Sequence, residues 1–218
     1  IIDIAQGMEE AFFDAPDPDS DVTPYGLKYW IVKNATTGFN GGNPSGFDDT
    51  GGVDASSNTK WRNYTGTYSK LSRDDVIREM KKAYRKTKWK SPVTLDQFRG
   101  KFGQRRRIYV NEETINAFED MLEAQNQNLG RDLFSYDGST VFKKTPIVWV
   151  PYLDDDSTNP VYMIDRDSFF PVILKGDYMR ETEPEKAPLQ HNTFVIFVDL
   201  TYNYLCINRR QNTVLYQA

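Results

Sequence analysis

Six short segments rich in β-branched and aromatic residues follow one another in the second half of this chain, and they restrict it to folds built on short strands. The segments cover residues 145–150, 161–164, 170–174, 193–200, 202–207 and 213–217. Turn-forming residues such as Pro151 and Asn159 stand between them. We predict mostly antiparallel strands, with residues 208–212 as a hairpin turn between the last two.

Two segments before these strands have the apolar spacing of helices. Residues 72–89 open with Ser72-Arg73-Asp74-Asp75, which resembles a capping box with Asp in place of Glu. Residues 106–110 predict a short strand, and Asn111 then predicts the N-cap of a second helix that ends near Gly130. Helices set among mostly antiparallel strands indicate an α+β fold.

The first third of the chain predicts a linker and an extended hairpin. Residues 14–24 are acidic and contain proline, as is typical of a linker. Residues 25–34 and 60–69 are aromatic and β-branched and predict two strands. The intervening residues 36–60 are rich in Gly, Asn, Ser and Asp. So long a loop is uncommon in a compact domain, so we expect it to be mobile or to contact a partner.

Charge is distributed unevenly along the sequence. Residues 1–59 have a net charge of −8, residues 60–107 a net charge of +12 and residues 108–218 a net charge of −8. A basic segment of this size fits nucleic acid, whose phosphates it would neutralise. It also fits the acidic surface of a second copy. The third reading, a solvated helix face, stays open as well.

Few residues are available for catalytic or metal chemistry. The single cysteine, Cys206, and the single histidine, His191, exclude an intrachain disulfide and a multi-histidine metal centre. Cys206 lies in an apolar strand segment and is expected to be buried and inert. Asp154–Asp156 lacks the spacing of a calcium loop and is interpreted as a surface turn. We predict no catalytic residue, no metal and no cofactor, and hence no enzyme.

The apolar runs are too short to span a membrane, so no membrane partner is predicted. The chain begins at Ile1, and its first residues lack the charged and apolar regions of a signal peptide. We therefore expect a fragment, a processed form or a shortened chain.

The order of motifs after residue 106 resembles the middle portion of tailed-bacteriophage major capsid proteins. The phrases that carry it are RIYVNEETINAFEDMLEAQNQNLG, VFKKTPIVWVPYLDDD and NPVYMIDRDSFFPVIL. Two earlier phrases, YGLKYWIVKNATTGFNGGNPSG and RNYTGTYSKLSRDDVI, look like a prophage branch of that group. Lys144 stands where many relatives have glycine.

The resemblance implies the Hong Kong 97-like capsid fold. It divides the chain into an N-terminal segment, an extended arm called the E-loop, a peripheral domain with a spine helix, and an axial domain. Carried over to this sequence, these parts cover residues 1–24, residues 25–68, residues 69–104 with 192–218, and residues 105–191, respectively.

The implied function is structural: a major capsid subunit that forms hexamers and pentamers around double-stranded DNA, with scaffold or portal proteins as further partners. The expected location is the virion capsid, and the bacterial cytoplasm before assembly. From the charge pattern we predict that acidic residues of one subunit meet basic residues of the next: Asp48, Asp49 and Asp54 on one side, and Arg78, Lys81, Lys82, Arg85, Lys86, Arg105, Arg106 and Arg107 on the other. The alternatives are a nucleic-acid-binding module that uses residues 60–107, and an enzyme with an unrecognised carboxylate site.

Overall fold

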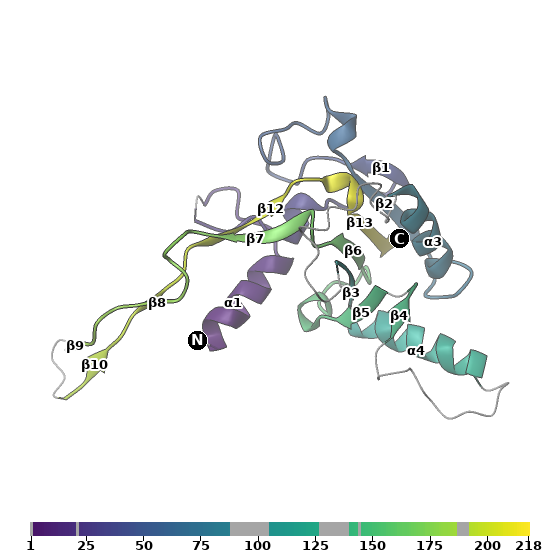
Figure 1. The fold of residues 1–218 in the computed structure, drawn as a ribbon. Helices are drawn as coiled ribbons and strands as arrows, with labels where there is room; N and C mark the ends of the chain where they lie inside the picture. Colours follow the sequence, from purple (N-terminus) through teal and green to yellow (C-terminus); the bar gives the residue numbers. More distant parts are fainter. Residues whose placement is uncertain (1, 21, 88–104, 127–139, 144, 187–191) are drawn as a thin grey trace.

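A computed structural model describes residues 2–20, 22–87, 105–126, 140–143, 145–186 and 192–218. In it, a body of sheet and helices carries one long two-stranded projection (Figure 1). Gly130, Lys144 and His191, all named above, lie outside the described residues, as do residues 88 and 89 at the C-terminal end of the predicted spine helix.

The body is organised around one mixed seven-stranded sheet with the order β1-β2-β13-β6-β3-β5-β4. Two of its neighbouring pairs, β2 with β13 and β3 with β5, are parallel, and the others are antiparallel. The seven strands are β1 (Gly38–Gly41), β2 (Asn63–Tyr68), β3 (Arg106–Val110), β4 (Val141–Phe142), β5 (Thr145–Trp149), β6 (Val161–Asp165) and β13 (Thr213–Gln217).

Helices cover both faces of this sheet. The helices and short 3-10 turns are α1 (Ile2–Phe13), α2 (Leu27–Trp30), η1 (Thr59–Trp61), α3 (Val76–Lys86), α4 (Glu112–Asn126), η5 (Pro151–Leu153) and η6 (Arg209–Gln211). Because strand side chains alternate between faces, Val161 and Met163 of β6 join the core under α3 and α4, while Tyr162 and Ile164 join the core under α1 and α2. Every residue of β6 is buried, as expected for a strand covered on both sides.

The unit β3–α4–β5 confirms the prediction made from its local sequence. Strand β3 spans the residues predicted, and the Asn111 side chain accepts a hydrogen bond from the Thr114 backbone N–H at 3.1 Å. This is the N-cap contact of α4. Helix α3 differs, because it begins at Val76 and has no capping box. The Asp75 carboxylate instead accepts hydrogen bonds from the backbone of Ser69 and Lys70.

The strand predicted over residues 25–34 is wrong, because the short helix α2 lies there. Its aromatic residues Tyr29 and Trp30 are buried against the body rather than along a sheet. Gly26 before the helix is forced by a close approach: a Cβ atom there would lie 2.2 Å from the Ala11 carbonyl oxygen. Burial of the aromatic side chains in a helical turn therefore outweighs their preference for strands.

The segment 25–68 does not project as the expected arm. Its loop folds back on the body, with Thr50 and Ala55 fully buried. The Trp61 indole donates to the Thr50 carbonyl at 2.9 Å, and the Tyr29 hydroxyl accepts from the Gly51 N–H at 3.0 Å. In the described residues, the part that projects lies later in the chain.

The Arg209 side chain anchors this folded segment to the body. Its side chain is fully buried and donates to the Trp30 carbonyl at 2.7 Å, the Gly42 carbonyl at 2.8 Å and the Asn63 side-chain oxygen at 3.2 Å. Burial lowers the pKa of Arg209 to about 10, which still leaves it charged at neutral pH. One side chain thus ties α2, the loop and β2 together.

The hairpin turn predicted at residues 208–212 is also wrong. The strand before it, β12 (Tyr202–Cys206), pairs with β7 (Phe169–Ile173), whereas β13 pairs with β2 and β6. The predicted strand 193–200 is broken into β10 (Phe194–Val195) and β11 (Val198–Asp199). The pairing of β13 with β6 joins residues 213–217 of the expected peripheral domain to residues 161–165 of the expected axial domain. The division of the chain into these two domains stays a prediction.

Candidate interaction surface

The projecting part is a long hairpin made of residues 168–186 and 192–207 (Figure 1). Its base is the β7–β12 pair. Farther out, β8 (Arg180–Glu181) pairs with β11, and β9 (Glu185–Lys186) pairs with β10. A two-stranded hairpin on its own is at best marginally stable in water. This hairpin must therefore gain its order from contacts at its base and along its faces.

The inner face of the base packs on α1. The Phe12 ring lies 5.1 Å from the Phe169 ring and 5.3 Å from the Tyr204 ring. The Tyr204 hydroxyl donates to the Met8 carbonyl at 2.5 Å, and burial raises the Tyr204 pKa. Cys206 lies on the same face and is 2% exposed, and burial raises the pKa of its thiol to about 12. The thiol is thus buried, as the sequence predicts.

The outer face of the same strands has no such cover. Directly paired residues share a face of a sheet, and alternate residues follow them. By this register the outer apolar face consists of Phe170, Val172, Leu174, Leu205 and Ile207. Leu174 is 60% exposed and Ile207 is 58% exposed.

Apolar exposure continues toward the tip. Of the thirteen large apolar side chains exposed in the described residues, eight belong to the long hairpin: Val172, Leu174, Tyr178, Phe194, Ile196, Phe197, Leu205 and Ile207. An apolar surface concentrated on one projection is typical of a site that contacts another protein.

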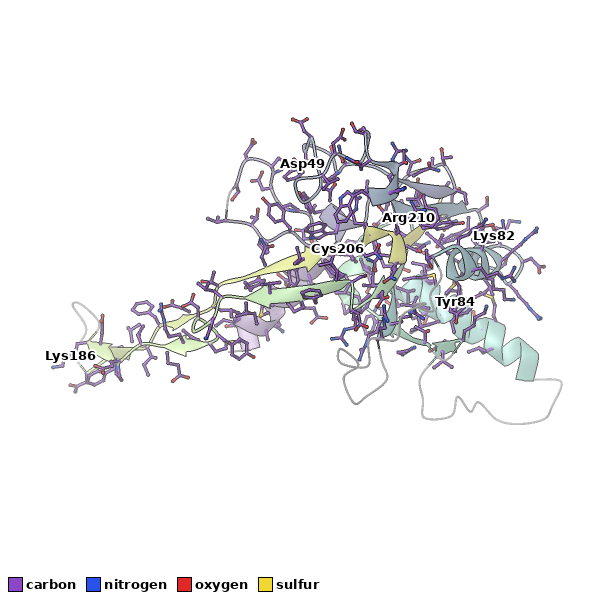
Figure 2. All side chains as sticks on the ribbon, turned by 45° about the horizontal axis from the view of Figure 1, so that its top comes forward. Asp49, Lys82, Tyr84, Lys186, Cys206 and Arg210 are labelled. Carbon is purple, nitrogen blue, oxygen red and sulfur yellow. The ribbon has the colours of Figure 1, made fainter. Side chains whose placement is uncertain are left out.

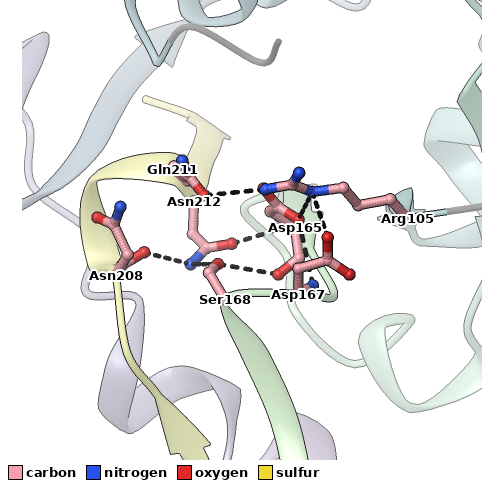
Figure 3. Close-up of polar contacts among 7 residues, drawn as sticks. All are labelled: Arg105, Asp165, Asp167, Ser168, Asn208, Gln211 and Asn212. Atoms are coloured by element: carbon pink, nitrogen blue, oxygen red, sulfur yellow. Dashed lines mark hydrogen bonds and ion pairs between the residues drawn. The ribbon is translucent and has the colours of Figure 1, made fainter. Parts of the chain in front are cut away.

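A polar network fixes the root of the hairpin where both strands leave the body (Figure 3). Arg105 donates to both carboxylate oxygens of Asp165, at 2.7 and 2.8 Å, and also pairs with Asp167 at 2.8 Å. The Asn212 side chain accepts from the Asp165 N–H at 2.9 Å and donates to the Ser168 hydroxyl at 3.0 Å. Since Asp165 precedes β7 and Asn212 follows β12, the network holds both strands at their origin.

The helix α3 presents the second candidate surface. Its basic face consists of Arg78, Lys81, Lys82, Arg85 and Lys86, while Val76, Met80 and Ala83 are buried against the sheet. Lys82 pairs with Glu79 on the same helix. The other four cations make no ion pair with any described residue.

The acidic and basic residues that are predicted to meet between two subunits lie apart within one chain. Asp49 and Lys82 lie at different parts of the body (Figure 2). Asp54 accepts hydrogen bonds within its own loop from Ser57, Ser56 and Asn43, which hold its pKa well below the usual range.

The remaining residues of the predicted interface differ in their exposure and in their contacts within the chain. Asp48 and Asp49 are exposed. Arg105 belongs to the root network, where it already pairs with Asp165 and Asp167, and its intersubunit role stays a prediction. Arg106 and Arg107 lie half-buried on β3 and have interactions within the chain. Burial lowers the Arg106 pKa to about 10.

The described residues offer little for metal chemistry. They contain no group of three or more His, Cys, Asp or Glu side chains that could hold a metal ion. In the acidic turn, Asp154 accepts from the Glu112 N–H at 2.7 Å, and Asp156 pairs with Lys33 at 2.6 Å. Among the described residues, no helix is both long and apolar enough to cross a membrane.

Comparison with known proteins supports the fold. No protein-family model matches the sequence, and no curated protein matches it. Among solved structures, a chain of the cyanophage A-1(L) capsid asymmetric unit is similar, with a TM-score of 0.58 and 14% sequence identity. The match covers 97% of this chain, which spans 65% of the length of that one. At this identity the likeness concerns the fold: this chain has a mixed α+β fold similar to that of a phage capsid protein.

Proposed function

We propose that this chain is the major capsid subunit of a tailed phage or prophage, with the Hong Kong 97-like fold, and that copies of it assemble into an icosahedral shell around double-stranded DNA. The likeness to a cyanophage capsid chain over 97% of its residues supports the proposal. The observation that carries it is the long hairpin, whose outer apolar face lacks cover in the single chain. Such a subunit works by association and not by turnover, in the virion after assembly and in the bacterial cytoplasm before it.

In this proposal the long hairpin is the principal intersubunit arm, in place of residues 25–68, for which the sequence predicts an extended arm. The hairpin projects and exposes apolar side chains, whereas the loop of residues 42–58 is packed on the body. Neighbouring subunits would cover the outer apolar face, as a hairpin of this length requires. Scaffold or portal proteins would be further partners of the assembling subunits.

The test compares two pairs of matched substitutions. Val172→Ser with Leu174→Ser removes apolar area from the outer face, whereas Leu122→Ser with Val141→Ser removes it from exposed sites elsewhere. Burial of one such side chain is worth about 1.5–3 kcal/mol, and these side chains are already partly covered. We expect the hairpin pair to weaken association by about 2 kcal/mol, or roughly 30-fold in Kd.

Sedimentation velocity over a concentration series measures the association, and urea unfolding shows whether each variant is folded. The control pair should associate like the unsubstituted chain. Equal association of all three folded proteins would refute the role of the hairpin. A monomer at every concentration in the unsubstituted chain would count against the capsid proposal itself.

A second candidate function, a nucleic-acid-binding module, rests on the basic face of α3. If its five cations each neutralised one phosphate, the logarithm of the binding constant would fall with the logarithm of salt with a slope of about −4.5. Titration of labelled double-stranded DNA at several salt concentrations measures this slope. Tight binding by monomers with that slope would favour this function over assembly.

A further inference from the structure

We propose that the acidic outer half of the long hairpin docks on the basic face of α3 in a second copy of this chain. This inference rests on the proposed self-assembly and specifies its partner surface.

The cations of α3 form a single stripe. With 3.6 residues per turn, Arg78, Lys81, Lys82 and Arg85 fall on one side of the helix, and Lys86 borders them. The stripe is about 12 Å long from residue 78 to residue 86, at a rise of 1.5 Å per residue. Four of the five cations have no ionic partner among the described residues.

The hairpin carries a row of three carboxylates that is about as long as the stripe of cations. Glu181, Glu183 and Glu185 are exposed, stand at alternate positions and make no ion pair with a described residue. From the first to the last, an extended chain covers about 13 Å. Asp177 and Asp199 differ, because both pair with Arg180 within the hairpin. The three glutamates are thus available for an external cation.

Within one chain the two surfaces cannot meet. The outer hairpin and α3 lie at opposite ends of the molecule in both views (Figures 1 and 2). The contact would therefore join different patches of two copies. A head-to-tail contact of this kind closes into a ring when its rotation fits, and continues as an open chain when it does not.

The basic face of α3 would also suit DNA, but the hairpin favours a protein partner. Tyr178, Phe194 and Phe197 are exposed. Phe194 pairs across the strands with Lys186, next to Glu185, and the Phe197 N–H donates to Thr182, between Glu181 and Glu183. Carboxylates repel phosphates, so the hairpin itself would not bind DNA. If α3 bound DNA, the apolar and acidic surface of the hairpin would have no binding partner. Docking of the hairpin on a second copy accounts for both surfaces at once.

Disulfide cross-linking tests the contact directly. The only native thiol, Cys206, is buried with its pKa raised to about 12, so an introduced cysteine becomes the reactive one. Chains with Glu183→Cys are mixed with chains with Arg85→Cys and oxidised under conditions where the protein associates. We expect covalent dimers whose peptide map joins positions 183 and 85. The matched control mixes Glu183→Cys with Asp49→Cys and should yield at least tenfold less dimer.

Exchange of the charges between the two surfaces shows which acidic residues bind the basic face of α3. Arg85→Glu with Lys86→Glu should abolish association, and the same chain mixed with Glu183→Lys and Glu185→Lys chains should recover it. Recovery with Asp48→Lys and Asp49→Lys chains instead would overturn the docking and restore the pairing predicted from sequence. Association that persists without the 183–85 link overturns the docking alone, whereas absence of any association by the unsubstituted chain overturns the proposed function. Loss of DNA binding with intact association in the α3 variant would assign that face to DNA.

Discussion

Replacement of Arg209 by methionine should destabilise the chain by about 3 kcal/mol, a figure that follows from its contacts. Its three hydrogen bonds join a charged donor to the Trp30 carbonyl, the Gly42 carbonyl and the Asn63 side chain. Hydrogen bonds to charged groups are worth about 1.5–3 kcal/mol each. Burial opposes them, because the pKa of Arg209 falls from 12.5 to about 10. At about 2 kcal/mol per bond the three bonds contribute about 6 kcal/mol, and removal of the buried charge returns about 3 kcal/mol, which leaves a net loss of about 3 kcal/mol.

Urea unfolding followed by tryptophan fluorescence measures this loss, and buried Trp30 reports on the same segment. Arg209→Lys should lose a similar amount, because one ammonium cannot reach three acceptors on three elements. Arg210→Met is the matched control. Arg210 is partly exposed, stacks on Phe39 at 3.9 Å and donates to the Thr59 carbonyl, so its loss should cost about 1 kcal/mol or less. A loss below about 1 kcal/mol for Arg209→Met would refute the reasoning.

Three further predictions concern groups that have polar contacts or are buried within the fold. Arg105→Gln leaves the fully buried Asp165 carboxylate without its cation and should cost about 3–5 kcal/mol in urea unfolding; an effect within error would contradict the role of the root network. Cys206 should not react with a thiol reagent in the folded chain and should react fully in urea, so rapid labelling of the folded chain would contradict its burial. Burial acts to raise the pKa of Asp156, but hydrogen bonds from Lys33 and Thr158 outweigh it and lower that pKa below 3.8. This carboxylate therefore stabilises the fold above pH 3.8 and loses that effect as pH falls through its lowered pKa. Asp156→Asn should flatten the loss of stability below pH 3.8, and an unchanged acid profile would contradict the assignment.

Local signals predicted the elements whose contacts are local. Asn111 marks the start of α4 because a cap is a contact between residues three apart. The pairing of strands was less accessible, since β12 and β13 follow each other in sequence yet bind different partners. Likewise, the Arg105–Asp165 pair joins residues 60 positions apart, so no local signal in the sequence indicates it.

The outer apolar face of the long hairpin can be recognised in the sequence. Residues 169–174 read FFPVIL, which is apolar at every position and so predicts a strand covered on both faces. In the single chain only the inner face is covered, by α1. An exposed apolar strand face of this kind is typical of a surface that a partner covers. Helix α3 also fits the pattern that the sequence predicted, with one buried and one basic face.

Electron microscopy of the associated protein tests the central claim, self-assembly through the long hairpin, most directly. The chain is imaged beside the Val172→Ser, Leu174→Ser variant and the matched Leu122→Ser, Val141→Ser control. The account predicts closed shells or rings of five or six subunits for the unsubstituted chain and the control, and single subunits for the hairpin variant. Dispersed single subunits in all three samples, or identical particles in all three, would contradict it.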